Sequence, residues 1–357
     1  MTPRERWINA IRRKGVDRMP CDYWGTAEMT GKLMKAAGIR TEDDLWKALG
    51  IDRMHYAGCE FRGPERTGGP ERTGGPGRAG GADVWGVEYR EVSYGNGAGS
   101  YNEAAVCPLA GAESVRDIEE YAWPDPKWWS ADGVRGQATA QAGWPIEGGY
   151  FAPFYLYTNM RGLEAAMTDL AENPEMVEAA LERIFHIMHD IFERTLKAAP
   201  GIIDFMEVTE DLGGQEAPLM SPATFRRLIK PRMKKMIELV HKHGAMAFHH
   251  DDGAIRPFIP ELLEVGIDML NPVQWRCPGM EREDLKRDFG DRVAFHGGID
   301  NQRTLPFGTP DDVRREVQES ARILGKGGGY VVAPCHNIQV ITPVENVFAM
   351  YEEVERL

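Results

Sequence analysis

From residue 143 onward, short apolar segments alternate with longer amphipathic segments, and this alternation constrains the fold more than any other feature of the chain. We predict strands at residues 144–150, 202–208, 245–251, 268–273, 293–299 and 330–336. We predict helices at residues 174–198, 222–243, 255–265, 281–289, 310–325 and 343–356. Strands and helices that alternate in this way are typical of a parallel sheet covered by helices.

Two further strand candidates lie upstream, at residues 18–24 and 51–58. They bring the number of predicted strands to eight, which is the number in a (β/α)₈ TIM barrel, a fold of ~250 residues. We therefore expect an α/β chain that forms a single barrel domain over residues 1–357, with most of the surplus length in an N-terminal insertion at 59–142. An open doubly wound sheet is the alternative, but no GxGxxG or GxxxxGK[ST] phosphate loop stands between a predicted strand and helix.

Within the insertion, residues 63–81 read GPERTGGPERTGGPGRAGG, in which GPERTG occurs twice in tandem. Such a segment has no apolar face to bury, and its glycines are costly in entropy to order. We expect an exposed low-complexity loop without chemistry of its own.

The charge balance argues against some classes of partner. Forty-two Lys and Arg face 55 Asp and Glu, which leaves a formal charge of −13, whereas nucleic-acid binding depends on clustered cations. No uncharged apolar run reaches the ~18 residues of a membrane span, and the charged first residues do not resemble a secretory signal. Five scattered cysteines without a CxxC pair are not a disulfide framework. We expect a cytoplasmic protein that binds neither nucleic acid nor membrane.

Polar and ionisable residues gather where the predicted strands end, which is where the active site of a barrel lies. The candidates, in chain order, are Glu207, Glu210, His250, Asp252, Asn271, Gln274, His296, Asp300, Cys335, His336 and Gln339. Any one of them alone could be a hydrogen-bonded core residue or a helix cap, but the whole set falls at one end of one sheet. Because strand residues alternate between the interior and the helix layer, only one of His249 and His250 should point inward.

Imidazoles, carboxylates and a thiol that converge from separate strands suit a divalent cation. Catalytic Zn²⁺ takes three such ligands and keeps one position open. We predict His250, Asp252 and His336 as ligands, with Cys335, Glu207 or Glu210 as a fourth. Among the remaining candidates, Glu207, His296 and Glu210 are predicted to handle protons, and Asn271, Gln274, Gln339 and Asp300 to bind substrate.

At these residues the chain resembles the uroporphyrinogen decarboxylase superfamily, which includes cobalamin-dependent methyltransferases. The resemblance rests on RERWINAIRRKGVDRMPCDYW near the start, LEAAMTDLAENPEMVEAALERI, HHDDGAIRPFIPELLEVGIDMLNPVQ, FHGGIDNQRTLPFGTPDDV and the closing GGGYVVAPCHNIQVITPVENVFAMYEEV. It covers nearly the whole chain outside 59–142 and also implies a (β/α)₈ barrel.

Two departures from the superfamily patterns concern the choice of branch. The decarboxylases carry an arginine-rich segment of the RQAGRY type near the N-terminus, where this chain has CDYWGTAEM, so the guanidinium clamps for a polycarboxylate are missing. The methyltransferases hold zinc on an HxC pair and a distant cysteine. Here Asp252 stands at the first cysteine position and His336, next to Cys335, at the second, which implies a metal site with harder ligands.

The resemblance thus favours a metal-dependent methyltransferase that uses Zn²⁺ or another divalent metal and exchanges a methyl group with a corrinoid on a partner protein. The alternative is a decarboxylase that acts on a small carboxylic acid, and true uroporphyrinogen decarboxylation is less favoured. A non-catalytic binding barrel is the third option, disfavoured because clusters of ionisable groups are costly to keep without a task. The oligomeric state is left open, with a homodimer as one candidate.

Overall fold

A curved parallel sheet occupies the centre of the computed structural model, which describes residues 1–64, 81–94 and 99–357. Within these residues the sheet has seven strands in the order β1-β6-β7-β8-β9-β10-β11, and every neighbouring pair is parallel. The strands are β1 His55–Tyr56, β6 Ile146–Phe151, β7 Phe205–Val208, β8 Met246–His250, β9 Met269–Asn271, β10 Ala294–Ile299 and β11 Tyr330–Pro334. The six strands predicted after residue 143 are thus confirmed, with shorter bounds.

The two upstream predictions hold only in part. The segment predicted at 51–58 is the two-residue strand β1, and the segment predicted at 18–24 forms a single parallel bridge between Cys21 and Val332 in place of a strand. The backbone of residues 18–24 nevertheless forms hydrogen bonds with neighbouring segments on both sides. The Asp22 amide donates to the Val332 carbonyl at 2.9 Å, and the Asp52 amide donates to the Cys21 carbonyl at 2.8 Å. The predicted number of eight strands is therefore not reached in the described residues.

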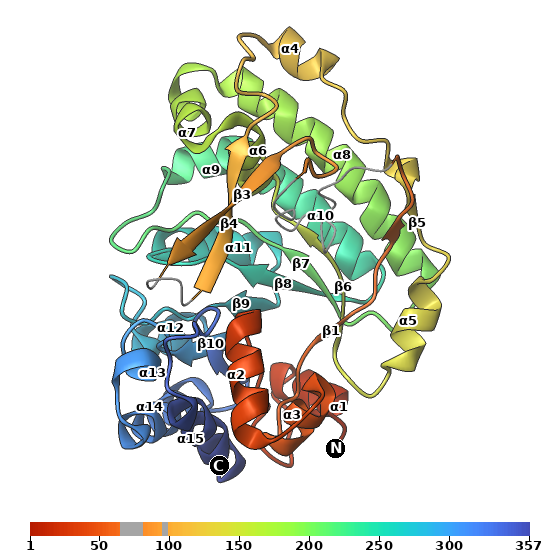
Figure 1. Ribbon diagram of the computed structural model, residues 1–357. Coiled ribbons are helices and arrows are strands. Elements are labelled where there is room, and N and C mark those ends of the chain that lie inside the picture. Colours follow the sequence, from red (N-terminus) through yellow and green to blue (C-terminus); the bar gives the residue numbers. More distant parts are fainter. Residues whose placement is uncertain (65–80, 95–98) are drawn as a thin grey trace.

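Helices follow the strands as the amphipathic pattern predicts. They are α8 Pro174–Ala198, α9 Pro222–Leu228, α10 Lys230–Lys242, α11 Ile259–Val265, α12 Arg282–Phe289, α14 Pro310–Leu324 and α15 Val344–Glu355. The helix predicted at 222–243 is split at Ile229, just before Pro231, which has no amide to donate to the preceding turn. Figure 1 shows α8 and α10 along one side of the sheet, and α12, α14 and α15 together at the lower left.

Further helices lie at the N-terminus and near the strand ends. At the N-terminus lie α1 Pro3–Ile11, α2 Ala27–Ala37 and α3 Glu42–Ala48, and around the strand ends lie α6 Pro153–Arg161, α7 Leu163–Glu172, η3 Arg256–Phe258 and α13 Thr304–Phe307. No helix in the described part of the chain combines the length and the apolar character needed to cross a membrane.

The concave side of the sheet is filled by two layers of side chains. In the lower layer, Trp7 and Ile11 of α1 pack against apolar strand residues, namely Phe205, Phe248, Met269, Ala294 and Val331. Two positions further along four of these strands stand Glu207, His250, Asn271 and His296. Because side chains two apart on a strand share a face, each of these four strands has an apolar residue below and a polar one above. The polar layer lies at the carboxyl ends of the strands.

Residues 59–142 carry small elements of their own: β2 Glu60–Phe61, β3 Glu88–Tyr94, β4 Gly99–Val106, α4 Val115–Glu120, η2 Pro126–Trp128, β5 Trp129–Ser130 and α5 Val134–Ala140. Strands β3 and β4 form an antiparallel hairpin, orange in Figure 1. Arg161 ties this region to the end of α6, since its guanidinium donates to the carbonyls of Leu109 and Ala112 at 2.7 and 2.8 Å. The exposed loop predicted at 63–81 falls almost wholly outside the described residues.

Candidate metal centre

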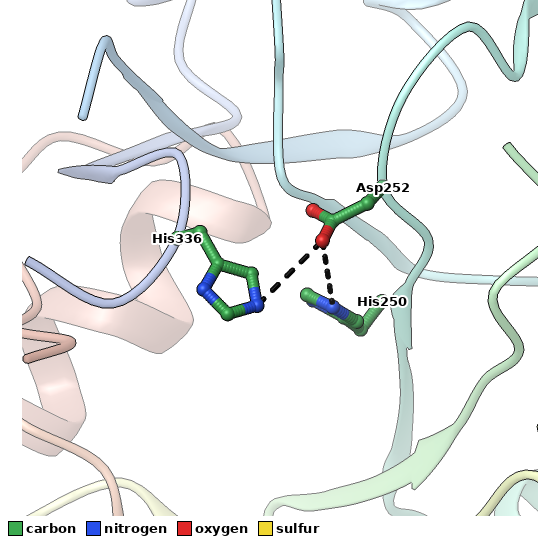
Figure 2. Close-up of side chains that lie close together, drawn as sticks. All are labelled: His250, Asp252 and His336. Atoms are coloured by element: carbon green, nitrogen blue, oxygen red, sulfur yellow. Dashed lines mark ion pairs between the residues drawn. The ribbon is translucent and has the colours of Figure 1, made fainter. Parts of the chain in front are cut away.

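Three side chains from β8 and β11 meet at the carboxyl end of the sheet. His250 is the last residue of β8, Asp252 follows two residues later, and His336 follows two residues after β11. One ligand atom of each lies within 4.8 Å of the other two. Asp252 Oδ2 is 3.9 Å from His250 Nε2 and 3.6 Å from His336 Nε2, and Figure 2 shows both imidazoles turned toward this carboxylate.

The spacing of these atoms suits a small divalent cation. Two ligands held ~2.0–2.1 Å from a tetrahedral Zn²⁺ lie about 3.4 Å apart, so the Asp252 distances need a change of about 0.5 Å or less. The second carboxylate oxygen, Oδ1, is buried and has no hydrogen-bond partner among the residues that the structure describes. A buried oxygen without a donor is costly, so this carboxylate keeps a free acceptor beside the oxygen that faces the two imidazoles. Three ligands also leave one position open for a reacting group.

The loops after β7 and β8 fix the position of Asp252 by backbone contacts. Asp251 Oδ1 accepts hydrogen bonds from the amides of Leu212 and Gly213, at 2.8 and 3.3 Å. Gly213 passes so close that a Cβ there would lie 2.0 Å from the Asp252 carbonyl oxygen, and a Cβ on Gly253 would lie 2.4 Å from the Gly214 carbonyl oxygen. Two glycines therefore allow the close approach that holds the ligand loop.

Neighbouring charges act on the two imidazoles in different degrees. Burial lowers the pKa of His250, but the carboxylates of Asp252 and Asp211 outweigh it and leave that pKa above its usual value. Asp211 Oδ1 lies 4.0 Å from His250 Nε2. For His336, partial burial prevails and leaves the pKa below its usual value, although Asp252 opposes the shift. Both imidazoles thus sit in a negative environment, which favours cation binding.

A chain of hydrogen bonds leads from His250 into the interior on the concave side of the sheet. His250 Nδ1 lies 2.5 Å from Asn271 Oδ1, and Asn271 Nδ2 lies 2.6 Å from His296 Nδ1. His296 Nε2 lies 3.1 Å from Asp22 Oδ2. Asn271 and His296 are fully buried, and both ring nitrogens of His296 are engaged.

Two of the predicted acidic residues, Glu210 and Asp300, accept hydrogen bonds from backbone amides. Glu210 accepts hydrogen bonds from the amides of Phe154 and Tyr155, at the start of α6, at 2.9 and 3.0 Å. Burial raises the pKa of Glu210 well above its usual value. Asp300 accepts from the amides of Gln302 and Thr304 and pairs with Arg276. These carboxylates hold loops in place, whereas Glu207 lies in the polar layer beside His250 and contributes to its electrostatic environment.

The other predicted residues lie around the three ligands. Gln274 Oε1 accepts from the Gly253 amide at 2.8 Å, and Gln339 accepts from the Tyr94 hydroxyl of the β3–β4 hairpin. Cys335 does not belong to the three-residue group. Its Sγ donates to the Val273 carbonyl at 3.1 Å, and burial raises the pKa of the thiol well above its usual value. Only one residue of the pair His249 and His250 points inward, as the alternation predicts: His249 faces outward and bonds the Val208 carbonyl.

Sequence reasoning missed Asp22 and Trp24. Trp24 stacks on His250 with ring centroids 5.4 Å apart and an interplanar angle of 30°, and its Nε1 donates to Asp22 Oδ2 at 3.1 Å. One available signal was the alternation itself, since it places Cys21 and Tyr23 on one face of the segment and Asp22 and Trp24 on the other.

The chain is similar to known proteins in sequence and in fold. The family model described as uroporphyrinogen decarboxylase (URO-D) matches residues 90–357. The methylcobamide:CoM methyltransferase MtaA of Methanosarcina barkeri is 24% identical over 206 residues, which are 58% of this chain and 56% of that protein. The uroporphyrinogen decarboxylase of Pseudomonas entomophila is 24% identical over 212 residues, which are 58% of this chain and 53% of that protein. The matches thus span about half the length of these curated relatives.

A solved structure, a methyltransferase from Methanosarcina mazei, superposes with a TM-score of 0.64 at 19% identity, over 100% of this chain and 99% of that one. At this identity the likeness is one of fold. The URO-D model, in contrast, matches well over half of the sequence. The chain therefore belongs to the uroporphyrinogen decarboxylase family.

Proposed function

We propose that this protein is a metal-dependent methyltransferase that transfers a methyl group to or from a corrinoid carried by a partner protein. The observation that carries the proposal is the group of His250, Asp252 and His336 at the carboxyl end of the sheet. The match to a methylcobamide:CoM methyltransferase supports the choice of reaction. The name of that relative supports the corrinoid, and the carrier protein rests on the family resemblance alone.

We also propose that the curved sheet is a (β/α)₈ barrel, with residues 18–24 in the place of the eighth strand and residues 59–142 as an insertion in a single domain. Backbone hydrogen bonds support this closure. The segment bonds β11 through Val332 on one side and Asp52, just before β1, on the other. A closed barrel would bring the β8 and β11 ligands to one rim.

In this proposal His250 Nε2, Asp252 and His336 Nε2 hold Zn²⁺ or another divalent metal, which when bound supplies Lewis acidity to a thiol or an ether oxygen. Glu207 is the acid–base residue, because it lies in the polar layer at the site. His296 is fully buried with both ring nitrogens bonded, so we assign it a positioning role in place of the proton transfer that the sequence suggested. Gln274 and Gln339 line the approach to the metal for a small substrate.

Metal analysis and a methyl-transfer assay test the proposal together. The purified protein should bind one zinc or cobalt ion, and His250→Ala or His336→Ala should abolish stoichiometric binding. Cys335→Ser should retain it. His186→Ala is a matched control, because that imidazole is 69% exposed and pairs with Glu182 on the surface.

The activity assay combines free methylcobalamin with a panel of small thiols. The absorbance change of methylcobalamin as it loses its methyl group measures the reaction. We expect turnover that a chelator abolishes and added metal restores. A wild-type protein that binds no metal, or a His250→Ala variant that demethylates methylcobalamin at the wild-type rate, would exclude a metal-dependent transfer.

A decarboxylase that acts on a small carboxylic acid is the second candidate, favoured by the matches to uroporphyrinogen decarboxylases. Electrostatics weigh against a polyanionic substrate, since the carboxylates of Asp252, Asp211 and Glu207 surround His250. This candidate predicts CO₂ release that persists in chelator and needs no corrinoid. The same protein preparations discriminate between the two functions.

A further inference from the structure

Asp22 is a buried carboxylate to which nothing in the proposed function gives a task. Its side chain is 1% exposed. Oδ2 lies 3.1 Å from both His296 Nε2 and Trp24 Nε1, and Oδ1 accepts from the Tyr23 amide at 2.8 Å. Both groups bonded to Oδ2 lead to His250, one through hydrogen bonds and one through ring stacking.

In the first route, the direction of hydrogen-bond donation is fixed once His250 binds the metal through Nε2, the nitrogen that faces Asp252 and His336. Nδ1 must then carry the proton and donate to Asn271 Oδ1. Asn271 Nδ2 donates in turn to His296 Nδ1, which therefore has no proton. The proton of His296 is on Nε2 and is donated to Asp22.

Every donor along this route thus points away from the metal position and toward one carboxylate. A carboxylate is an acceptor only, so it fixes the direction of the chain from its far end. The same logic applies to metal-bound histidines that donate directly to a carboxylate. Here the carboxylate acts across an amide and a second imidazole.

The second route holds the plane of the His250 ring. The Trp24 indole stacks on that ring at 5.4 Å, and its Nε1–H donates to Asp22 Oδ2 at 3.1 Å. The indole therefore cannot rotate without losing this bond. Around His296, Trp7 and Phe248 pack at 5.5 and 5.4 Å and leave that imidazole little freedom.

We infer that Asp22 is the positioning residue of the metal centre, which sets the tautomer of His250 through Asn271 and His296 and the plane of its ring through Trp24. The effect of Asp22 on metal affinity rests on the proposed function, whereas the direction of the hydrogen bonds can be tested in the protein without metal. Outer-shell partners of this kind change metal affinity by ~10- to 100-fold.

Asp22→Asn is the sharpest perturbation, because it keeps the shape and removes the charge. The new amide has two orientations. In the first its NH₂ group faces the Tyr23 amide, and in the second it faces His296 and Trp24. All three of these groups are donors to Asp22. In the second orientation His296 must accept, so its proton moves to Nδ1 and Asn271 flips. His250 then carries its proton on Nε2, the nitrogen that the metal needs.

The matched control is Asp83→Asn. Asp83 is also 1% exposed, but its donors are the amides of Trp85 and Val87 and the hydroxyl of Tyr89, all within the insertion. We expect Asp22→Asn to weaken zinc binding ~10- to 100-fold in competition with a chromophoric chelator and to change the visible spectrum of the Co²⁺-substituted protein. Asp83→Asn should leave both unchanged. An Asp22→Asn variant that folds and keeps the wild-type affinity and Co²⁺ spectrum would overturn the inference.

A second measurement uses the unmodified protein and needs no variant to fold. In ¹⁵N-histidine-labelled protein, long-range ¹H–¹⁵N correlation spectra identify the protonated nitrogen of each imidazole. We expect Nδ1–H for His250 and Nε2–H for His296, with zinc and also without metal at a pH where both rings are neutral. The opposite tautomer at either residue would refute the inferred direction. If the wild type binds no metal but shows these tautomers, the proposed function fails and the inferred direction stands.

Discussion

Gly213→Ala should disrupt the metal centre without touching a ligand side chain. The added Cβ would lie 2.0 Å from the Asp252 carbonyl oxygen and 2.6 Å from Ile255 Cγ2. Since carbon and carbonyl oxygen approach no closer than ~3.3 Å, the two backbones must separate by about 1.3 Å. Metal–ligand distances tolerate changes of only ~0.2 Å. The Asp252 carboxylate follows its own backbone, so the ligand set is broken.

We expect the zinc dissociation constant of Gly213→Ala to rise by ~10- to 100-fold, which is about 1.4–2.7 kcal/mol of binding free energy. Competition with a chromophoric chelator measures it, and circular dichroism verifies that the variant is folded.

Gly31→Ala is the matched control for this prediction. It adds the same methyl group in the interior of α2, where nothing lies within 4 Å. A helix-interior alanine is favoured over glycine by about 1 kcal/mol, so this variant should be more stable and bind zinc as the wild type does. A folded Gly213→Ala protein with wild-type zinc affinity would show that the loop contact does not position Asp252, and the reasoning from close approach would fail.

Two further predictions concern stability. Asp169→Ala should lower the free energy of unfolding by about 3–5 kcal/mol in urea titrations, because it leaves the buried guanidinium of Arg161 without its carboxylate and removes the 2.6 Å bond from the Tyr157 hydroxyl; a loss below 1 kcal/mol would contradict this. For Lys286, burial and the nearby Arg13 lower the pKa from 10.5 to about 8, so the folded state loses this proton before the unfolded state does. The free energy of unfolding of the wild type should therefore rise, relative to that of Lys286→Met, by up to about 3 kcal/mol as the pH increases from 8 to 10.5. A difference between the two proteins that does not change with pH would refute the lowered pKa.

The sequence predicts the regular part of the fold well because local patterns decide it. The helix predicted at 174–198 is α8 with the same bounds, and six strands stand where apolar runs were found. The segment at 18–24 is different. Pro20 has no amide to donate, and the backbone bonds of its neighbours go to Val332 and Asp52. Whether such a segment joins a sheet depends on residues far along the chain, which no local pattern contains.

The candidate site divides in the same way. Strand alternation predicts that only one of His249 and His250 points inward, and the structure shows that it is His250. The strand-end rule brings Asp252 and His336 to it. The same rule cannot separate a carboxylate that faces the site from one that accepts backbone amides. Glu210 is the second kind because α6 begins directly after β6 and presents its first amides to that carboxylate. Asp22 lies 228 residues before His250, and only the folded chain connects them.

The proposed ligand set of one carboxylate and two imidazoles has an electrostatic consequence that connects these observations. Asp252 with two neutral imidazoles leaves one positive charge on a divalent cation, and burial keeps the Cys335 thiol protonated by raising its pKa. The compensating charge must come from outside the ligand set. Glu207 and Asp211 already act on His250, and Asp22 reaches it through hydrogen bonds. In the proposed metal site, Glu207 and Asp211 would therefore balance the charge of the cation, and the hydrogen bonds from His250 to Asp22 would hold the imidazole in place.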